Sequence, residues 1–289
     1  MQSLWINTSK ACQTTIMHIY TIVYNNASFL ELQYLSFRKH CPLQSFTVID
    51  NSNNAQTKLE VAEFAGNHGC YVVYPTSQRF DNAGFSHQAA LKTATQLLAN
   101  SLGISIICDP DVFLLGQLPL HEIYTHDFSG LMQGTDEVQY LWPGFLVINP
   151  LTLQAEIDLR GALVNPNNLD DFIIPDTAAG WSWESYPEQL KTYTPTDSGG
   201  LLCRYIRKHS PKILEFSLAF MGDMCYDPSV MPEHLRSKYN NLYNFWVING
   251  NVLHSGRLSN WDNRPSDEVT AKSELVKDIV RYYIDNNKD

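Results

Sequence analysis

The 289-residue sequence lacks the motifs that most directly assign a nucleotide-dependent or hydrolytic function. It contains no Gly-x-x-x-x-Gly-Lys loop, no Gly-x-Gly-x-x-Gly and no Gly-x-Ser-x-Gly. The usual signatures of P-loop hydrolysis, dinucleotide redox chemistry and α/β-hydrolase chemistry are therefore all missing.

An excess of positive charge is also missing. The chain has 30 acidic and 20 basic side chains, with no dense run of lysine and arginine. A free-standing nucleic-acid binder normally presents a basic surface, so we expect no nucleic-acid partner. The short cluster Arg204, Arg207 and Lys208 is interpreted as a solvated helix face. A small anionic ligand stays compatible with the acidic chain if a metal ion neutralises it locally.

Paired cysteines and long apolar runs are lacking as well. None of the six cysteines has Cys-x-x-Cys spacing, which argues against a zinc ribbon or a dithiol redox motif and favours a reducing compartment. No stretch approaches the ~20 apolar residues of a transmembrane helix, and Met1 to Thr15 has no apolar secretory core. We therefore expect a soluble, cytoplasmic protein.

Strands and helices alternate in the first half of the sequence. Short β-branched and aromatic runs predict strands at 16–24, 46–49, 70–74 and 104–108. Apolar periodicity predicts helices between them, at 28–38 with Ser28 as the N-cap, at 57–66 and at 84–100. This alternation predicts an α/β fold with a mainly parallel sheet and helices on both faces.

The second half is less regular but has no linker or repeat that would separate it from the first. It predicts a strand at 145–148, a strand within 245–253, and helices at 199–209 and 267–283. We expect one domain over residues 1–289. Residues 16–115 would form the nucleotide-binding half, and residues 116–289 the half that binds sugar and acceptor.

Polar clusters directly follow three of the predicted strands, at Asn25-Asn26, at 50–54 and at 109–111. In an open parallel sheet, ligands bind at the carboxyl ends of the strands. The sequence thus predicts a site where these clusters meet.

Asp109-Pro110-Asp111 is the strongest local feature, because it follows the apolar run Ile104 to Cys108. Pro110 favours an extended conformation at Asp109, so that both carboxylates can approach one cation. Oxygen ligands suit Mg²⁺ or Mn²⁺, and such a cation offsets the charge of a leaving nucleoside diphosphate. The alternative interpretation is a turn with a capping aspartate.

This pattern resembles the Asp-x-Asp motif of GT-A fold glycosyltransferases, enzymes that use nucleotide sugars. Three further segments agree with the resemblance: Phe85-Ser86-His87 at a helix start, the glycine and strand of 142–150, and Val252 to Arg257 followed by Trp261. The resemblance covers about residues 16 to 261 and implies a Rossmann-like GT-A fold. The sequence departs from the glycogenin-like pattern at Ser259-Asn260, where that pattern has Lys-Pro.

The resemblance also implies site residues. His254 becomes the third metal ligand beside Asp109 and Asp111, and Arg257 a partner of the phosphates. Asn25 and Asp50 contact the nucleobase and ribose of the donor. The residues expected to flank the diphosphate or sugar are Arg79, Asn82 and His87. For His254 and Asp50 the alternatives are a buried rim histidine and an Asx-turn.

Two carboxylates are candidates for a catalytic base. Asp197 precedes Gly199-Gly200, two glycines expected to open a helix with free backbone N–H groups, and it can accept the proton of an acceptor hydroxyl. Glu184 is the rival base, beside Trp181 and Trp183, which can stack on a sugar. A simple helix cap is the alternative for Asp197. Asp197 as the base favours inversion, whereas the His254 segment favours a retaining family.

The sequence thus predicts a metal-dependent glycosyltransferase, of the hexosyl- or pentosyltransferase kind, with a nucleotide-diphosphate sugar donor and a hydroxyl acceptor such as a glycan. Its expected cofactor is Mn²⁺ or Mg²⁺. The alternatives are a nucleotidyltransferase that forms nucleotide sugars and a non-catalytic nucleotide- or carbohydrate-binding module.

Overall fold

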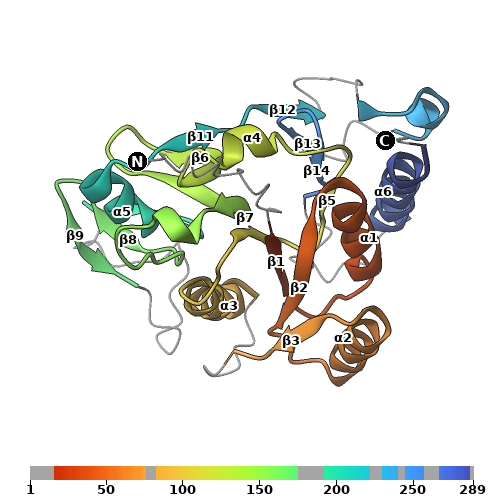
Figure 1. Cartoon of the computed structure of the whole chain (residues 1–289), viewed down its shortest axis with the longest axis horizontal. Coiled ribbons are helices and arrows are strands. Elements are labelled where there is room, and N and C mark those ends of the chain that lie inside the picture. The colour runs from red at the N-terminus through yellow and green to blue at the C-terminus, as the bar shows by residue number, and fades with distance from the viewer. Residues whose placement is uncertain are drawn as a thin grey trace, which may run out of the picture.

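The computed structural model describes residues 16–75, 83–174, 192–221, 230–239, 245–256 and 267–286. Its central element is a seven-stranded sheet in the order β11-β6-β7-β4-β1-β2-β3 (Figure 1). The strands of this sheet are β1 (Met17–Val23), β2 (Leu43–Asp50), β3 (Tyr71–Val73), β4 (Ile104–Cys108), β6 (Phe128–Gly134), β7 (Gln139–Ile148) and β11 (Ile213–Glu215). Only the pairs β4–β7 and β6–β7 are antiparallel, so the predicted mainly parallel α/β sheet is confirmed.

Helices cover both faces of this sheet because side chains on its strands alternate between two cores. On β1, Met17 and Ile19 pack with α1 (Leu30–His40) and α2 (Ala55–His68), whereas Tyr20 and Ile22 face the opposite way. The second face is covered by α3 (Ala83–Leu98) and α5 (Leu202–His209). The predicted helices on both faces are therefore confirmed.

A second sheet of four strands, in the order β12-β13-β14-β5, supports the region that follows β4. Its strands are β12 (Leu218–Met221), β13 (Phe245–Ile248), β14 (Val252–His254) and β5 (Val112–Leu114). The C-terminal helix α6 (Asp267–Asn286) buries Leu275, Val276, Ile279 and Val280 against this sheet and α1. In Figure 1, α6 stands beside α1 at one end of the molecule.

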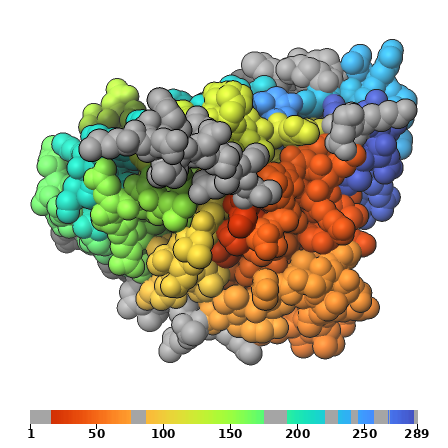
Figure 2. Space-filling model, viewed as in Figure 1, coloured from red at the N-terminus to blue at the C-terminus, as the bar shows by residue number. Residues whose placement is uncertain are grey.

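The remaining described elements are short. They are α4 (Leu120–Ile123), the 3-10 helices η1 (Pro150–Thr152) and η5 (Glu233–Lys238), and a small sheet of β8 (Leu163–Asn165), β9 (Asn168–Ile173) and β10 (Thr194–Pro195). In Figure 2, residues 16–75 occupy the lower right of the visible face, and the green and cyan segments of the second half lie at its left. Within the described residues, no helix has both the length and the apolar character needed to cross a bilayer.

Two local predictions were wrong. Ser28 does not cap α1: its backbone N–H and its hydroxyl both donate to Oδ1 of Asn26, and the helix begins later, at Leu30. The helix expected from Gly199 begins at Leu202, because residues 198–201 form a turn.

Candidate metal and donor site

The turn Asp109-Pro110-Asp111 joins β4 of the seven-stranded sheet to β5 of the four-stranded sheet. The N–H of Asp109 donates to the carbonyl of Gly144 on β7 at 2.9 Å, and the N–H of Val112 donates to the carbonyl of Asp109 at 3.3 Å. The two carboxylates thus stand where a buried strand leaves one sheet and enters the other.

Strand pairing brings His254 to this turn from a distant part of the chain. Strand β14 pairs antiparallel with β5, with His254 opposite Val112. The N–H of Ser255 donates to the carbonyl of Asp111 at 3.1 Å. Because the two strands are paired here, the backbone fixes the imidazole beside the acidic turn.

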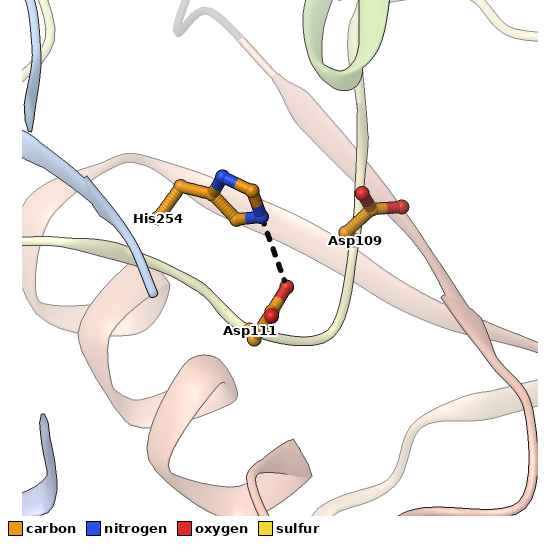
Figure 3. A group of neighbouring side chains, drawn as sticks. All are labelled: Asp109, Asp111 and His254. Carbon is orange, nitrogen blue, oxygen red and sulfur yellow. Dashed lines mark ion pairs between the residues drawn. The ribbon is translucent and has the colours of Figure 1, made fainter. Parts of the chain in front are cut away.

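The side chains of Asp109, Asp111 and His254 form a compact group of possible metal ligands. One atom from each lies within 4.8 Å of the others, and Nε2 of His254 is 3.4 Å from Oδ1 of Asp111. Figure 3 shows Asp111 and His254 pointing toward each other, with Asp109 on the same turn.

Asp111 is fully buried, and apart from the ion-pair contact of Oδ1 with His254 its carboxylate oxygens have no hydrogen-bond partner among the described residues. Orphaned buried carboxylate oxygens cost free energy unless a cation satisfies them. Two carboxylates and one imidazole suit a divalent ion such as Mn²⁺. The residues present therefore fit a metal ion.

The two aspartates differ in their electrostatics. Burial raises the pKa of Asp109, as does repulsion from Asp111 and Asp197, while His87 and His254 act in the opposite direction. Burial also opposes ionisation of Asp111, but the contact with His254 and the charge of Lys272 outweigh it, and the pKa of Asp111 is lowered. Asp111 is therefore the more firmly ionised carboxylate.

Two tryptophans hold the imidazole ring of His254. Its ring centroid lies 4.9 Å from that of Trp142 on β7 and 5.1 Å from that of Trp246 on β13. A Cβ at position 144 would lie 1.9 Å from the Trp142 ring, so only glycine there allows this arrangement. The glycine in the 142–150 segment thus makes room for a ring that packs on a candidate metal ligand.

Gln33 on α1 was missed by the sequence analysis. It is fully buried, and its Nε2 donates to the carbonyls of Asp109 at 2.6 Å and Val112 at 2.9 Å. Its neighbour Ser36 accepts a hydrogen bond from the N–H of Leu114 at 3.2 Å. The available signal was a polar residue on the apolar stripe of a helix, three residues after Leu30 and four before Phe37.

Asp50 and Asn25 lie at the same sheet edge as the acidic turn. Val23 is paired with Asp50 and Thr21 with Cys108, so Asp50 and Asp109 stand on the two sides of β1, about 10 Å apart by strand spacing. Asp50 is buried, and its Oδ2 has no hydrogen-bond partner among the described residues. The Oδ1 of Asn25 is already engaged, because it accepts the N–H groups of Asn53 and Asn54.

Asp197 and His87 both act on the pKa of Asp109 through their charge, which places them near the acidic turn. The side chain of Asp197 is exposed, and its Oδ1 accepts the N–H of Ser198 at 2.7 Å. The expectation of free N–H groups after it is wrong: Gly199 donates to Leu159 and Gly200 to Asp197. His87 lies on α3 and is half-buried.

The remaining predicted residues, Arg79, Asn82, Glu184 and Arg257, lie outside the described residues, as do Trp181, Trp183 and Trp261.

A groove of about 610 Å³ lies elsewhere, between α5 and the β8–β9 hairpin. It is lined in part by Arg204, Arg207 and Lys208, but by none of the predicted site residues. Arg204 forms an ion pair with Asp170 at 2.8 Å and stacks on Phe172. This groove has no part in the metal site.

No known family profile matches the sequence, and no curated protein matches it. The solved structures that match over part of the chain include glycosyltransferases, the class that the Asp-x-Asp resemblance indicates. One is a mannosyltransferase from Pyrobaculum calidifontis in complex with GDP-Man and Mn²⁺, 16% identical, with a TM-score of 0.32 over 46% of this chain and 44% of that chain.

Another is the galactosyltransferase LgtC in complex with donor and acceptor sugar analogues, 15% identical, with a TM-score of 0.33 over 46% of this chain and 58% of that chain. A third is mannosyl-3-phosphoglycerate synthase from Rubrobacter xylanophilus, 15% identical, with a TM-score of 0.30 over 48% and 54%. The chain thus spans about half the length of each. TM-scores this low carry no argument about activity, which has to rest on the site.

Proposed function

We propose that this protein is a metal-dependent glycosyltransferase that uses a nucleotide-diphosphate sugar. The observation that carries the proposal is the compact group of Asp109, Asp111 and His254, in which Asp111 is fully buried and its carboxylate oxygens accept no hydrogen bond from the described residues. When a divalent ion is bound there, it supplies positive charge to the diphosphate that leaves.

The neighbouring strand end supports a nucleotide as the ligand. Asp50 lies about 10 Å from Asp109 across the sheet, judged by strand spacing, and one of its buried oxygens has no partner among the described residues. A ribose or base N–H donor bound at Asp50 would leave the diphosphate free to reach the acidic turn. Further contacts to the donor are proposed for Arg79, Asn82, His87 and Arg257.

Transfer requires that the bond from the anomeric carbon to the diphosphate breaks while a bond to the acceptor oxygen forms. The hydroxyl proton then passes to a base, and the nucleoside diphosphate leaves. Asp197 is our proposed base, because its exposed carboxylate lies within electrostatic reach of Asp109. Glu184 stays the alternative.

A thermal-shift screen tests the proposal with nucleoside diphosphates and their sugars, each with and without Mn²⁺. At least one nucleotide should raise the melting temperature only with Mn²⁺, and Asp111→Ala should abolish that shift. Release of nucleoside diphosphate from the sugar donor would then separate a transferase from a binding module. No shift with any nucleotide in the presence of Mn²⁺ would refute the proposal.

A further inference from the structure

The C-terminal helix α6 carries a lysine where its apolar stripe calls for a hydrophobic residue. The buried face of α6 contains Leu275, Val276, Ile279 and Val280. Lys272 lies three and four residues before the first two of these, hence on the same face. It is only 8% exposed. A buried ammonium costs free energy unless its surroundings compensate for the charge.

The contacts of Lys272 lie close in sequence to the candidate metal ligand His254. Its Nζ donates to the carbonyl of Gly256, two residues after His254, and lies 5.4 Å from the centre of the Phe245 ring on β13. Its charge is also among the causes that lower the pKa of Asp111. The ammonium therefore lies just beyond the end of β14, at a carbonyl two residues after His254.

A count of charges indicates what this ammonium can do. The charges of two ionised aspartates and one divalent ion cancel, and the leaving nucleoside diphosphate then adds a net negative charge. A fixed positive charge beside the site stabilises the complex with bound metal and nucleoside diphosphate, and it acts more strongly in a buried setting than in water. When the metal ion binds without a diphosphate, the same positive charge weakens binding, because it repels the ion.

We propose, building on the function proposed above, that Lys272 is a positioning residue of the donor site. Its ammonium holds the Gly256 carbonyl and offsets the charge of the leaving diphosphate, so that helix α6 takes part in donor binding.

Titration calorimetry with Mn²⁺ alone, and then with UDP and GDP at saturating Mn²⁺, tests this inference. Lys272→Met should weaken binding of the nucleoside diphosphate by about tenfold or more, while the affinity for Mn²⁺ alone stays equal or rises. Lys272→Arg, which keeps the charge, should restore most of the affinity. Lys277→Met is the matched control: this lysine lies on the same helix and pairs with Glu274.

A purely structural role would weaken Mn²⁺ and diphosphate binding together, and that result would overturn the inference, as would unchanged diphosphate binding. If Lys272→Met does not fold, Lys272→Gln replaces it, since glutamine removes the charge but can still donate to Gly256. If the wild-type protein binds neither Mn²⁺ nor a diphosphate, the proposed function itself fails, and this inference fails with it.

Discussion

Asp111 is the residue on which the metal site depends most. Its carboxylate is fully buried, its Oδ1 lies 3.4 Å from Nε2 of His254, and His254 and Lys272 are the residues that lower its pKa. Asp109 differs, because it is only half-buried and its pKa is raised. We therefore expect the two carboxylates to contribute unequally.

Asp111→Asn should lower the affinity for Mn²⁺ by ~100-fold or more, because it replaces a charged ligand with a neutral one of the same shape. Asp109→Asn should have a smaller effect. Calorimetric titration of each variant with Mn²⁺ measures both. Asp170→Asn, in an exposed ion pair remote from the turn, is the control. Equal affinities for wild type and Asp111→Asn would contradict this assignment.

The cysteine thiols give a prediction that is independent of function. Burial raises the pKa of Cys41 to about 12 and those of Cys70 and Cys203 to about 11. Since thiolates are the reactive form, iodoacetamide at pH 8 should alkylate Cys41 and Cys203 far more slowly in the native protein than in urea. Peptide mass spectrometry measures the rates, and equal rates would show that these thiols are not buried.

The same shifts affect stability in alkali. A thiol whose pKa is raised on folding contributes stability that is fully present below the unfolded pKa near 9 and is lost as the pH rises toward 11 or 12. The free energy of unfolding should therefore fall between pH 9 and 11. Cys203→Ala, which removes one such group, should make the fall shallower.

At the scale of elements, helix α1 supports the acidic turn. The carboxamide of Gln33 bridges the carbonyl groups of Asp109 and Val112, one on each side of the turn's second carboxylate. Gln33→Leu keeps the side-chain volume but removes both hydrogen bonds. It should lower the free energy of unfolding by about 1–3 kcal/mol and weaken Mn²⁺ binding by about tenfold.

Urea denaturation and Mn²⁺ titration measure these two effects. Gln56→Leu, on the exposed side of α2, is the control and should change stability by no more than about 0.5 kcal/mol. A Gln33→Leu protein that binds Mn²⁺ as tightly as the wild type would show that α1 does not position the turn.

A pair of glycines gives a second test at this scale. Gly144→Ala puts a Cβ against the Trp142 ring and should cost about 1–3 kcal/mol, since the ring that packs on His254 has to move. Gly66 is exposed within α2, and a Cβ added there would meet no described atom within 4 Å, so Gly66→Ala should instead stabilise by about 0.5–1 kcal/mol. Urea denaturation should show that the two substitutions change the free energy of unfolding in opposite directions. Destabilisation by both would contradict the packing described.

At the scale of the whole molecule, the first half of the main sheet could be predicted from local sequence patterns. The runs around Ile19, Ile49 and Ile106 are short, apolar and separated by amphipathic segments, so strands β1 to β4, the helices between them and their parallel direction could be predicted. Strands β6 and β11 of the same sheet were not predicted. The polar residues after these strands could be assigned to one edge for the same reason. The division into a nucleotide half and an acceptor half stays a prediction.

The second sheet and the supporting contacts could not be predicted in this way. Strand β5 has three residues, and its pairing with β14 depends on contacts between distant parts of the chain, which leave no periodic signal. His254 was predicted as a metal ligand only from the resemblance to a family. Gln33 and Lys272 are polar residues at buried helix positions, and their hydrogen-bond partners are seen only in the three-dimensional structure. The turn after Asp197 was misjudged because one of its N–H groups bonds to a distant segment, at Leu159.

The central claim is that the acidic turn and His254 hold a metal ion that binds a nucleoside diphosphate. A crystal grown with Mn²⁺ and a nucleoside diphosphate tests it most directly, through anomalous scattering at the manganese edge. We predict one strong anomalous peak within coordination distance of Asp109, Asp111 and His254, in contact with the diphosphate oxygens. A bound diphosphate with no anomalous peak at this turn would contradict the account.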